Sequence, residues 1–255
     1  MKIKEPASTW PSGYGRVILD EVGSTLDEAR RATRTQPVPF WLLAHRQTAA
    51  RGRRGRAWVM RRGNFAATLV LPTTGGPETA ALRSFVMSLA LYRTLLVLTG
   101  LPEAFSLKWP NDVLAHGGKL AGILLETIGG TDQLAIGVGV NLKHAPEQSE
   151  VEPHAVRPVC LLGETGHLVM PEVFLTTLAA HYAVLEDQFA TFGFAPIRAA
   201  WLTHAARLGC SIIVRLPDRT LDGIFEDVDP SGHLVLRGAD RLHKIAAADI
   251  YFEER

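Results

Sequence analysis

The chain is organised around the stretch Arg46-Gln47-Thr48-Ala49-Ala50-Arg51-Gly52-Arg53-Arg54-Gly55-Arg56-Ala57-Trp58. Seven arginines and no acidic residue lie between Arg46 and Arg62, whereas the rest of the chain carries 20 basic and 26 acidic residues. Glycines let backbone N–H groups approach a ligand closely, and guanidinium groups match phosphate or carboxylate oxygens. The stretch therefore predicts a loop that binds an anion, either a small molecule or a nucleic acid.

The overall composition is that of a globular protein from a reducing compartment. The chain has 255 residues, of which 47% are hydrophobic and 21% charged, and a net charge of +1. The two cysteines, Cys160 and Cys210, lack metal-ligand spacing, so we expect neither a disulfide framework nor a zinc site. The apolar region 89–101 is interrupted by Arg93, and the N-terminus lacks a signal-peptide core. We therefore expect a cytoplasmic protein without a membrane span.

Hydrophobic periodicity on both sides of the stretch predicts an α+β fold, in which helices flank a mixed β-sheet. Strands are expected at 16–20, 40–44, 64–71, 105–108, 119–126 and 134–141, and helices at 26–31, 77–98, 171–192 and 196–208. The character changes after Arg207, where short apolar runs are separated by Pro, Gly and Asp. Strands at 211–216, 221–228, 234–237 and 243–252 predict a small SH3-like barrel, so that residues 1–207 and 208–255 form two domains.

Polar residues and glycines mark where a ligand could bind this fold. Ser24 and Thr25 precede the first predicted helix, where they either cap it or present hydroxyl groups to a ligand. Gly137 and Gly139 lie two residues apart on a predicted strand, so both clear the same face of the sheet for a close neighbour.

Four interpretations of the arginine–glycine stretch compete. It could be a solvated basic loop or a nucleic-acid site, although an RGG-like repeat is absent. It could be a phosphate-binding P-loop, but the required Gly-x-x-x-x-Gly-Lys-Ser/Thr spacing is also absent. The fourth interpretation is a loop that closes over an activated small molecule bearing a phosphate.

Five motifs favour the fourth interpretation through a resemblance to the bacterial biotin protein ligases. Gln47–Arg56 is similar to that family's biotin and adenylate loop, and Gly23–Thr25 to its Ser-Thr motif. Lys108–Asp112, Lys119–Glu126 and Gly137–Asn141 resemble three further family motifs. All five follow one another in family order over roughly residues 14–141, and the small β end fits the family's C-terminal domain.

The resemblance implies a two-step reaction with ATP, biotin and Mg²⁺. The carboxylate of biotin attacks the α-phosphate of ATP to give biotinyl-5′-AMP and pyrophosphate. A lysine amine of the biotin carrier domain of a carboxylase then displaces AMP and forms an amide.

The resemblance also implies a role for individual residues. Lys119 and Arg53 would be catalytic and would contact the adenylate, together with Asn141 near the nucleotide. Asp112 is the candidate to hold Mg²⁺ and could equally be only a turn former. Arg54 and Arg56 are as well explained by solvated charge. Contacts with biotin or its adenylate are implied for Ser24, Thr25, Gln47, Arg51, Gly52, Arg53, Lys119, Gly122, Leu124, Gly137 and Gly139.

Two positions depart from the family pattern. Leu26 stands where the family often has Asn after Ser-Thr, which removes one polar contact to biotin. Ala50 stands where the family favours Gly, so one methyl group must be accommodated or must face away from the ligand.

Rival functions remain open at this point. A lipoate or octanoate ligase or transferase shares the catalytic fold, and a basic nucleic-acid-binding module belongs to a different class. Only about 15 residues precede the first predicted strand, too few for a helix-turn-helix, so we expect no DNA-regulatory role. The sequence leaves open a homodimer.

Overall fold

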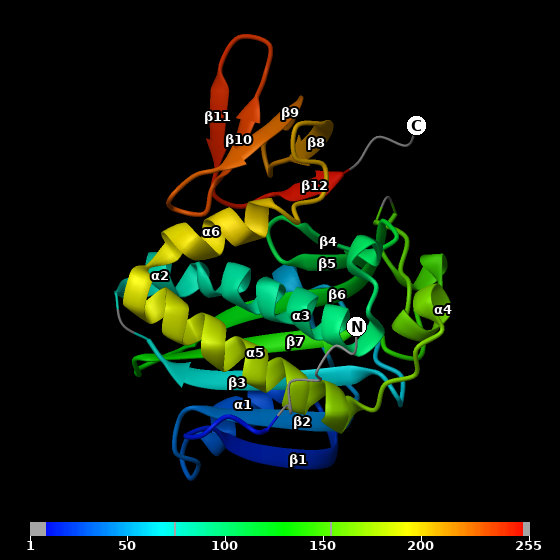
Figure 1. The fold of residues 1–255 in the computed structure, drawn as a ribbon, viewed down its shortest axis with the longest axis vertical. Coiled ribbons are helices and arrows are strands. Elements are labelled where there is room, and N and C mark those ends of the chain that lie inside the picture. The colour runs from blue at the N-terminus through cyan, green and yellow to red at the C-terminus, as the bar shows by residue number, and fades with distance from the viewer. Residues whose placement is uncertain (1–8, 74, 154, 252–255) are drawn as a thin grey trace, which may run out of the picture.

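The main sheet contains seven strands in the order β1-β2-β3-β7-β6-β5-β4 (Figure 1). The structure is a computed structural model and describes residues 9–73, 75–153 and 155–251. β1 pairs with β2 in parallel, and the other neighbouring strands pair antiparallel, so the predicted mixed sheet is confirmed. The strands are β1 (Gly15–Val22), β2 (Phe40–Gln47), β3 (Phe65–Pro72), β4 (Phe105–Lys108), β5 (Asp112–Ala115), β6 (Gly118–Ile128) and β7 (Gln133–Val140).

Helices cover the two faces of this sheet unequally. The long helices α3 (Arg83–Thr99) and α5 (Pro171–Phe192) pack on one face, while the short helix α1 (Thr25–Ala32) packs on the other (Figure 1). Side chains alternate along β2: Trp41 joins the core beneath α3 and α5, and Leu42 joins the smaller core beneath α1. Because both faces of β2 are buried, its sequence is a continuous apolar run. The short α1 leaves part of its face for a cavity.

The predicted long helix over 77–98 is divided at Leu82 into α2 (Gly76–Ala81) and α3. Gly76–Thr99 is apolar enough to cross a membrane by length and composition, but 67% of its most apolar window is buried inside the structure. Its buried side chains belong to the core with β2 and β3, so the packing explains their hydrophobicity.

Two other segments differ from the predicted helices. In place of the helix expected over 196–208, the structure has the shorter helix α6 (Phe194–Leu202), which begins and ends earlier in the chain. Ala206 N–H donates to the carbonyl oxygen of Leu107 at 2.7 Å, so the chain after α6 leaves the helix to bond with β4. In the irregular region 143–170 the structure has a 3₁₀ helix at Gln148–Glu150 and the short helix α4 (Leu161–Thr165).

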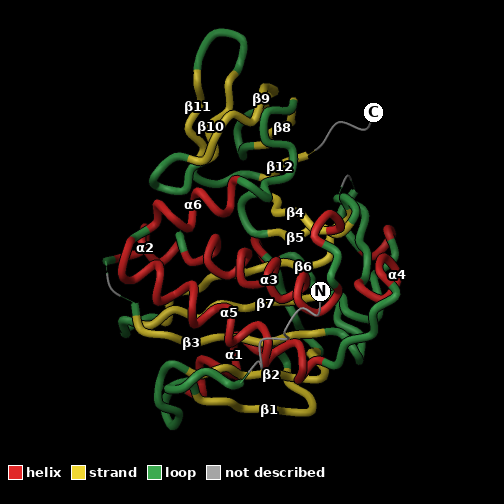
Figure 2. Tube along the Cα trace, in the orientation of Figure 1, coloured by secondary structure: helices red, strands yellow, loops and turns green. Residues whose placement is uncertain are grey.

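The C-terminal strands form a second, five-stranded antiparallel sheet in the order β11-β10-β9-β8-β12 (Figure 2). The single strand expected over 243–252 is two strands, and Phe252 lies outside the described residues. Within the described chain β11 and β12 are opposite edges of this sheet, so its closure into a barrel stays a prediction. The strands are β8 (Ser211–Arg215), β9 (Thr220–Val228), β10 (Leu234–Arg237), β11 (Leu242–Ile245) and β12 (Asp249–Tyr251).

The small sheet packs on α6 and on the β4–β5 end of the main sheet (Figures 1 and 2). Trp201 of α6 and Val228 of β9 belong to one continuous apolar core. The buried indole N–H of Trp109 donates to the carbonyl oxygen of Gly232 at 3.0 Å. The predicted boundary at 207/208 falls in the connection between α6 and β8.

Candidate functional site

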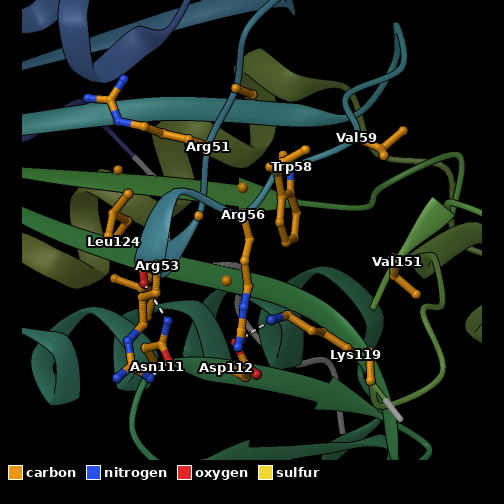
Figure 3. A pocket seen from close by; sticks show the side chains of 18 of the residues that line it. Arg51, Arg53, Arg56, Trp58, Val59, Asn111, Asp112, Lys119, Leu124 and Val151 are labelled. Atoms are coloured by element: carbon orange, nitrogen blue, oxygen red, sulfur yellow. Dashed lines mark hydrogen bonds and ion pairs between the residues drawn. The ribbon is translucent and has the colours of Figure 1, made fainter. Parts of the chain in front are cut away.

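A cavity of about 210 Å³ lies on the α1 face of the main sheet, beneath the arginine–glycine loop (Figure 3). Its wall also receives residues from segment 146–158 and from Ala248–Ile250 of the small domain. The structure brings all of the proposed site residues to this one cavity, namely Ser24, Thr25, Gln47, Arg51, Gly52, Arg53, Asp112, Lys119, Gly122, Leu124, Gly137, Gly139 and Asn141.

The floor of the cavity is a patch of glycine backbone on two neighbouring strands. Gly122 of β6 lies opposite Gly139 of β7, and Leu124 lies opposite Gly137. A Cβ atom on Gly139 would come within 2.6 Å of the Trp58 ring, and one on Gly137 within 3.0 Å of Leu26. A close neighbour therefore does cover this face, as the Gly-x-Gly spacing predicts.

The Ser24–Thr25 corner of the cavity is built from buried polar groups. The carbonyl oxygen of Ser24 accepts the first helical hydrogen bond of α1, yet its side chain makes no capping hydrogen bond. Thr25 donates from its backbone N–H at 2.7 Å and from its hydroxyl at 3.0 Å to Oε1 of Gln47. Capping does not occupy the Ser24 hydroxyl, although that side chain is only 4% exposed. This favours the ligand-binding interpretation of Ser24.

Acidic residues from other segments neutralise most of the arginine–glycine loop. Six of the seven arginines between Arg46 and Arg62 form ion pairs, among them Arg54 and Arg56, for which solvated charge was an equally good explanation. Such local neutralisation argues against a loop that offers its charge to a long polyanion. The pairs are Arg46–Glu21, Arg51–Asp27, Arg51–Glu126, Arg54–Asp249, Arg56–Asp249, Arg56–Glu152, Arg61–Glu150 and Arg62–Asp20.

Arg53 is the exception within this loop, because it makes no ion pair with any acid in the described part of the chain. Its Nη1 donates to Oδ1 of Asn111 at 3.3 Å and to the carbonyl oxygen of Ala248 at 3.4 Å (Figure 3). Burial lowers the pKa of Arg53, although the nearby carboxylates of Asp249 and Asp112 oppose that shift. A partly buried cation held by neutral acceptors is poised to receive an anion.

The guanidinium group of Arg51 lies elsewhere and points away from Lys119 and Asp112 (Figure 3). It forms a bidentate pair with Asp27 at 2.8 and 2.9 Å and a further bond to Glu126 at 3.1 Å. The hydrogen bonds that Arg51 donates to Asp27 and Glu126 raise its pKa. In this structure the Arg51 side chain anchors the base of the loop to α1 and β6. It is therefore not placed for the side-chain contact with biotin that was expected of it.

A cluster of charges from β4, β5 and β6 closes the other end of the cavity. Nζ of Lys119 lies 2.8 Å from Oδ1 of Asp112, and Nζ of Lys108 lies 3.6 Å from Oδ2. Burial favours the neutral form of Asp112, but the two lysines outweigh burial and hold the pKa of Asp112 below its usual range. Burial lowers the pKa of Lys108 despite the attraction of Asp112.

This geometry bears on the expected role of Asp112 as a magnesium ligand. Both of its carboxylate oxygens face lysine ammonium groups rather than a second acid. In the described parts of the chain, no three His, Cys, Asp or Glu side chains are grouped so that they could hold a metal. The residues therefore do not fit a magnesium site held by the protein, and they make Asp112 the counter-ion of Lys119 and Lys108.

Replacing Asp112 with Asn is expected to lower the free energy of unfolding by about 3 kcal/mol at pH 7, because Lys108 is left buried without its counter-ion. The folded-state pKa of Asp112 lies below its unfolded value. Its contribution is therefore present above about pH 4 and is lost as the pH falls through the folded pKa. Urea denaturation between pH 3 and pH 7 should show the two proteins converging at low pH. The variant Asp132→Asn, at an exposed position, is the control. A difference in unfolding free energy between wild type and Asp112→Asn that does not narrow at low pH would contradict this assignment.

Asn141 directly follows β7, and its side chain is buried in the cavity wall. Its Nδ2 donates to the carbonyl oxygen of Val159 at 3.1 Å, whereas its buried Oδ1 has no hydrogen-bond partner in the described chain. Buried polar atoms are usually satisfied, so an unpartnered acceptor in a cavity wall indicates a missing donor.

Several lining residues were not assigned to the site from the sequence. Lys108 and Asn111 lie within the motif Lys108–Asp112, and Trp58 ends the arginine–glycine stretch. Their residue types and positions in the sequence could therefore have indicated them. Glu152 and Asp249 gave no signal, because their relation to the loop exists only in three dimensions.

Comparisons with known proteins agree with this geometry. Residues 15–142 match the biotin/lipoate A/B protein ligase family, and residues 208–253 match the biotin protein ligase C-terminal domain. A biotin–[acetyl-CoA-carboxylase] ligase of Paracoccus denitrificans is 50% identical over 92% of this chain and 99% of its own. The Mycobacterium tuberculosis protein of that name is 32% identical over 94% of this chain and 90% of its own. The fold resembles the biotin protein ligase of Aquifex aeolicus in complex with biotin and ATP, with a TM-score of 0.78 at 24% identity over 92% of this chain and 97% of that one.

Proposed function

The chain belongs to the biotin/lipoate A/B protein ligase family, and we propose that its cavity activates biotin with ATP for transfer to a lysine of a carrier protein. The observation that carries this proposal is the change of polarity along the cavity wall. Uncharged hydrogen-bonding groups stand at Ser24, Thr25 and Gln47, and cations stand at Lys119 and Arg53. Biotin has a matching order, in which a neutral ureido ring, an apolar body and a carboxylate follow one another.

The reaction has two steps in which charge develops near the cations. A carboxylate oxygen of biotin forms a bond to the α-phosphorus of ATP, and the bond to the β-phosphate oxygen breaks to release pyrophosphate. The neutral amine of the carrier lysine then attacks the acyl carbon, AMP leaves with the electron pair of the C–O bond, and the nitrogen loses a proton. The first step joins two anions, so cations aimed at both groups are required.

Lys119 and Arg53 are the groups proposed to meet that charge. The Lys119 ammonium is held 2.8 Å from Asp112 on a side chain that is 32% exposed, so it can follow charge at the mouth of the cavity. Arg53 lines the same cavity, is partly buried with neutral partners, and supplies a planar fork to the adenylate phosphate. Magnesium would enter with the triphosphate as part of the substrate.

The opposite end of the cavity is proposed to bind the ureido ring. Because Oε1 of Gln47 already accepts two hydrogen bonds from Thr25, its amide N–H groups and the Ser24 hydroxyl are the groups offered to the ring. Gly122, Gly137 and Gly139 provide a flat floor beside Leu124, once Trp58 moves from the place it occupies here. The unpartnered Oδ1 of Asn141 would accept a donor from the nucleotide.

The proposed partner is the biotin carrier domain of a biotin-dependent carboxylase, in line with the name of the Paracoccus denitrificans relative.

Ala50, which stands where the family favours Gly, also lines the cavity. Its carbonyl oxygen accepts a hydrogen bond from Trp58 N–H at 3.0 Å.

Pyrophosphate exchange into ATP tests the proposed reaction against its nearest rival. Biotin should support exchange, whereas lipoate and octanoate supplied in turn should not. Both rivals use the same catalytic fold, and the family match covers both kinds of ligase. Exchange with lipoate but not with biotin would falsify the assignment. Salt-dependent binding to RNA without ATP consumption would instead indicate a nucleic-acid module.

A further inference from the structure

One acidic residue of the small domain reaches the tip of the arginine–glycine loop. Asp249 begins β12, the edge strand that faces the main domain, and it lines the cavity together with Ala248 and Ile250. A single oxygen, Oδ2 of Asp249, accepts from Nη1 of Arg54 at 2.8 Å and from Nη2 of Arg56 at 2.7 Å. The two residues are separated from Asp249 by more than 190 positions along the chain.

The carboxylate of Asp249 is well suited to hold both guanidinium groups. Its side chain is only 15% exposed while the side chains of Arg54 and Arg56 are 44% and 35% exposed, so solvent screens the two ion pairs in part. Burial favours the neutral form, but hydrogen bonding to Arg56 and the charges of Arg56, Arg54 and Arg53 outweigh it and lower the pKa of Asp249. The group is therefore an anion at neutral pH.

The backbone at the loop tip indicates that local sequence alone does not hold its shape. Arg54 has a φ of 58°, in the left-handed region that residues other than glycine rarely adopt, and Gly55 follows with a φ of 73°. Gly52 N–H donates to the carbonyl oxygen of Arg56 at 2.7 Å, and Trp58 N–H donates to that of Ala50 at 3.0 Å, so the base of the loop is closed by its own bonds. The strained tip itself depends on contacts from outside to stay in one conformation.

The same contacts place the arginine that the active site uses. Arg53 precedes the strained turn, and its Nη1 donates to the carbonyl oxygen of Ala248, the neighbour of Asp249. Asp249 also attracts the Arg53 and Lys108 charges. Holding Arg54 and Arg56 therefore fixes the backbone that aims Arg53 at the cavity.

We propose that Asp249 is a positioning residue through which the small domain holds the arginine–glycine loop over the cavity and so retains the acyl-adenylate. The proposal rests on the proposed function only for its second half, because the loop contact exists without a ligand. It assigns the small domain a share in the reaction of the main domain. Asp249 acts through Arg53, Arg54 and Arg56 and does not itself touch the reacting atoms.

Amide hydrogen exchange of residues 51–57 in the ligand-free protein tests the loop contact. The isosteric variant Asp249→Asn should exchange on the order of tenfold faster than wild type, since two partly screened ion pairs are lost. The matched control Asp218→Asn, an exposed carboxylate of the same small domain, should exchange like wild type. If Asp249→Asn fails to fold, the double variant Arg54→Gln, Arg56→Gln removes both pairs from the loop side, together with the Arg56–Glu152 pair, and should give at least the same increase.

Dissociation of pre-formed biotinyl-AMP tests the second half. In Asp249→Asn the adenylate should leave on the order of tenfold faster and KM for ATP should rise, while kcat for pyrophosphate exchange should change less than twofold. A purely structural role would lower the melting temperature without this division between KM and kcat. Unchanged exchange protection in Asp249→Asn overturns the proposal whether or not the protein activates biotin, whereas absence of biotin-dependent chemistry in wild type overturns only the proposed function.

Discussion

Replacing Lys119 with alanine is expected to slow biotin-dependent adenylation by about 10²- to 10³-fold, the usual effect of removing one preorganised donor from a developing charge. Lys119 sits at the start of β6 with its ammonium 2.8 Å from Asp112, and its stem passes over Gly122 in the floor. Two anions approach one another in the first step, so the lost cation acts on the transition state more than on binding. Pyrophosphate exchange at saturating ATP and biotin measures this loss.

The cost to stability should be much smaller, and a second variant separates the two effects. In Lys119→Ala the Asp112 carboxylate keeps Lys108, so we expect a loss of about 1–3 kcal/mol in urea denaturation. The double variant Lys119→Ala, Asp112→Asn removes both charges and should be no less active than the single variant. Exchange at the wild-type rate in a folded Lys119→Ala protein would exclude Lys119 from the chemistry.

Replacing Arg53 with alanine is expected to release biotinyl-AMP about 10- to 100-fold faster, because a charge-assisted hydrogen bond of about 1.5–3 kcal/mol is lost. Arg53 is partly buried, and within the described chain its guanidinium bonds only to the neutral oxygens of Asn111 and Ala248. The released mixed anhydride should biotinylate lysines of an unrelated bystander protein. A chase with unlabelled biotin measures the release, and blotting of the bystander measures the stray transfer.

Stability again distinguishes this role from a structural one. Removing a partly buried cation that lacks an acidic partner should leave the free energy of unfolding of the empty protein unchanged or slightly higher. Arg46→Ala is the matched control, since that loop arginine pairs with Glu21 at an exposed site. If Arg53→Ala retains the intermediate as well as Arg46→Ala does, Arg53 lies outside the adenylate site.

The elements of the fold could be predicted where periodicity and punctuation were strong. The helix Pro171–Phe192 was predicted with the bounds that the structure has, because proline starts it and Gly193 ends it. The last strand was predicted as one, yet Ala246–Ala248 separates β11 from β12. That division depends on pairing with β10 and β8, two partners on opposite sides of the small sheet, which a local pattern does not contain.

The candidate site could be predicted as a set of residues but not as a set of contacts. The Gly137–Gly139 spacing indicated a close neighbour on one sheet face, and that inference follows from the two-residue period of a strand. The neighbours themselves, Trp58 and Leu26, come from a loop and a helix whose approach is set by packing. Asp112 was expected to hold a metal, whereas the fold places two lysines against it.

By itself the sequence determined the mixed sheet, the open Gly137–Gly139 face and the charge of the loop, because these depend on period, residue type and local order. Only the tertiary structure decided what each arginine does. Six of them meet acids from distant segments, among them Asp249 of the small domain, and Arg53 meets only neutral oxygens. The physical reason is that a charge acts through the groups within a few ångströms of it, and those groups are chosen by the fold.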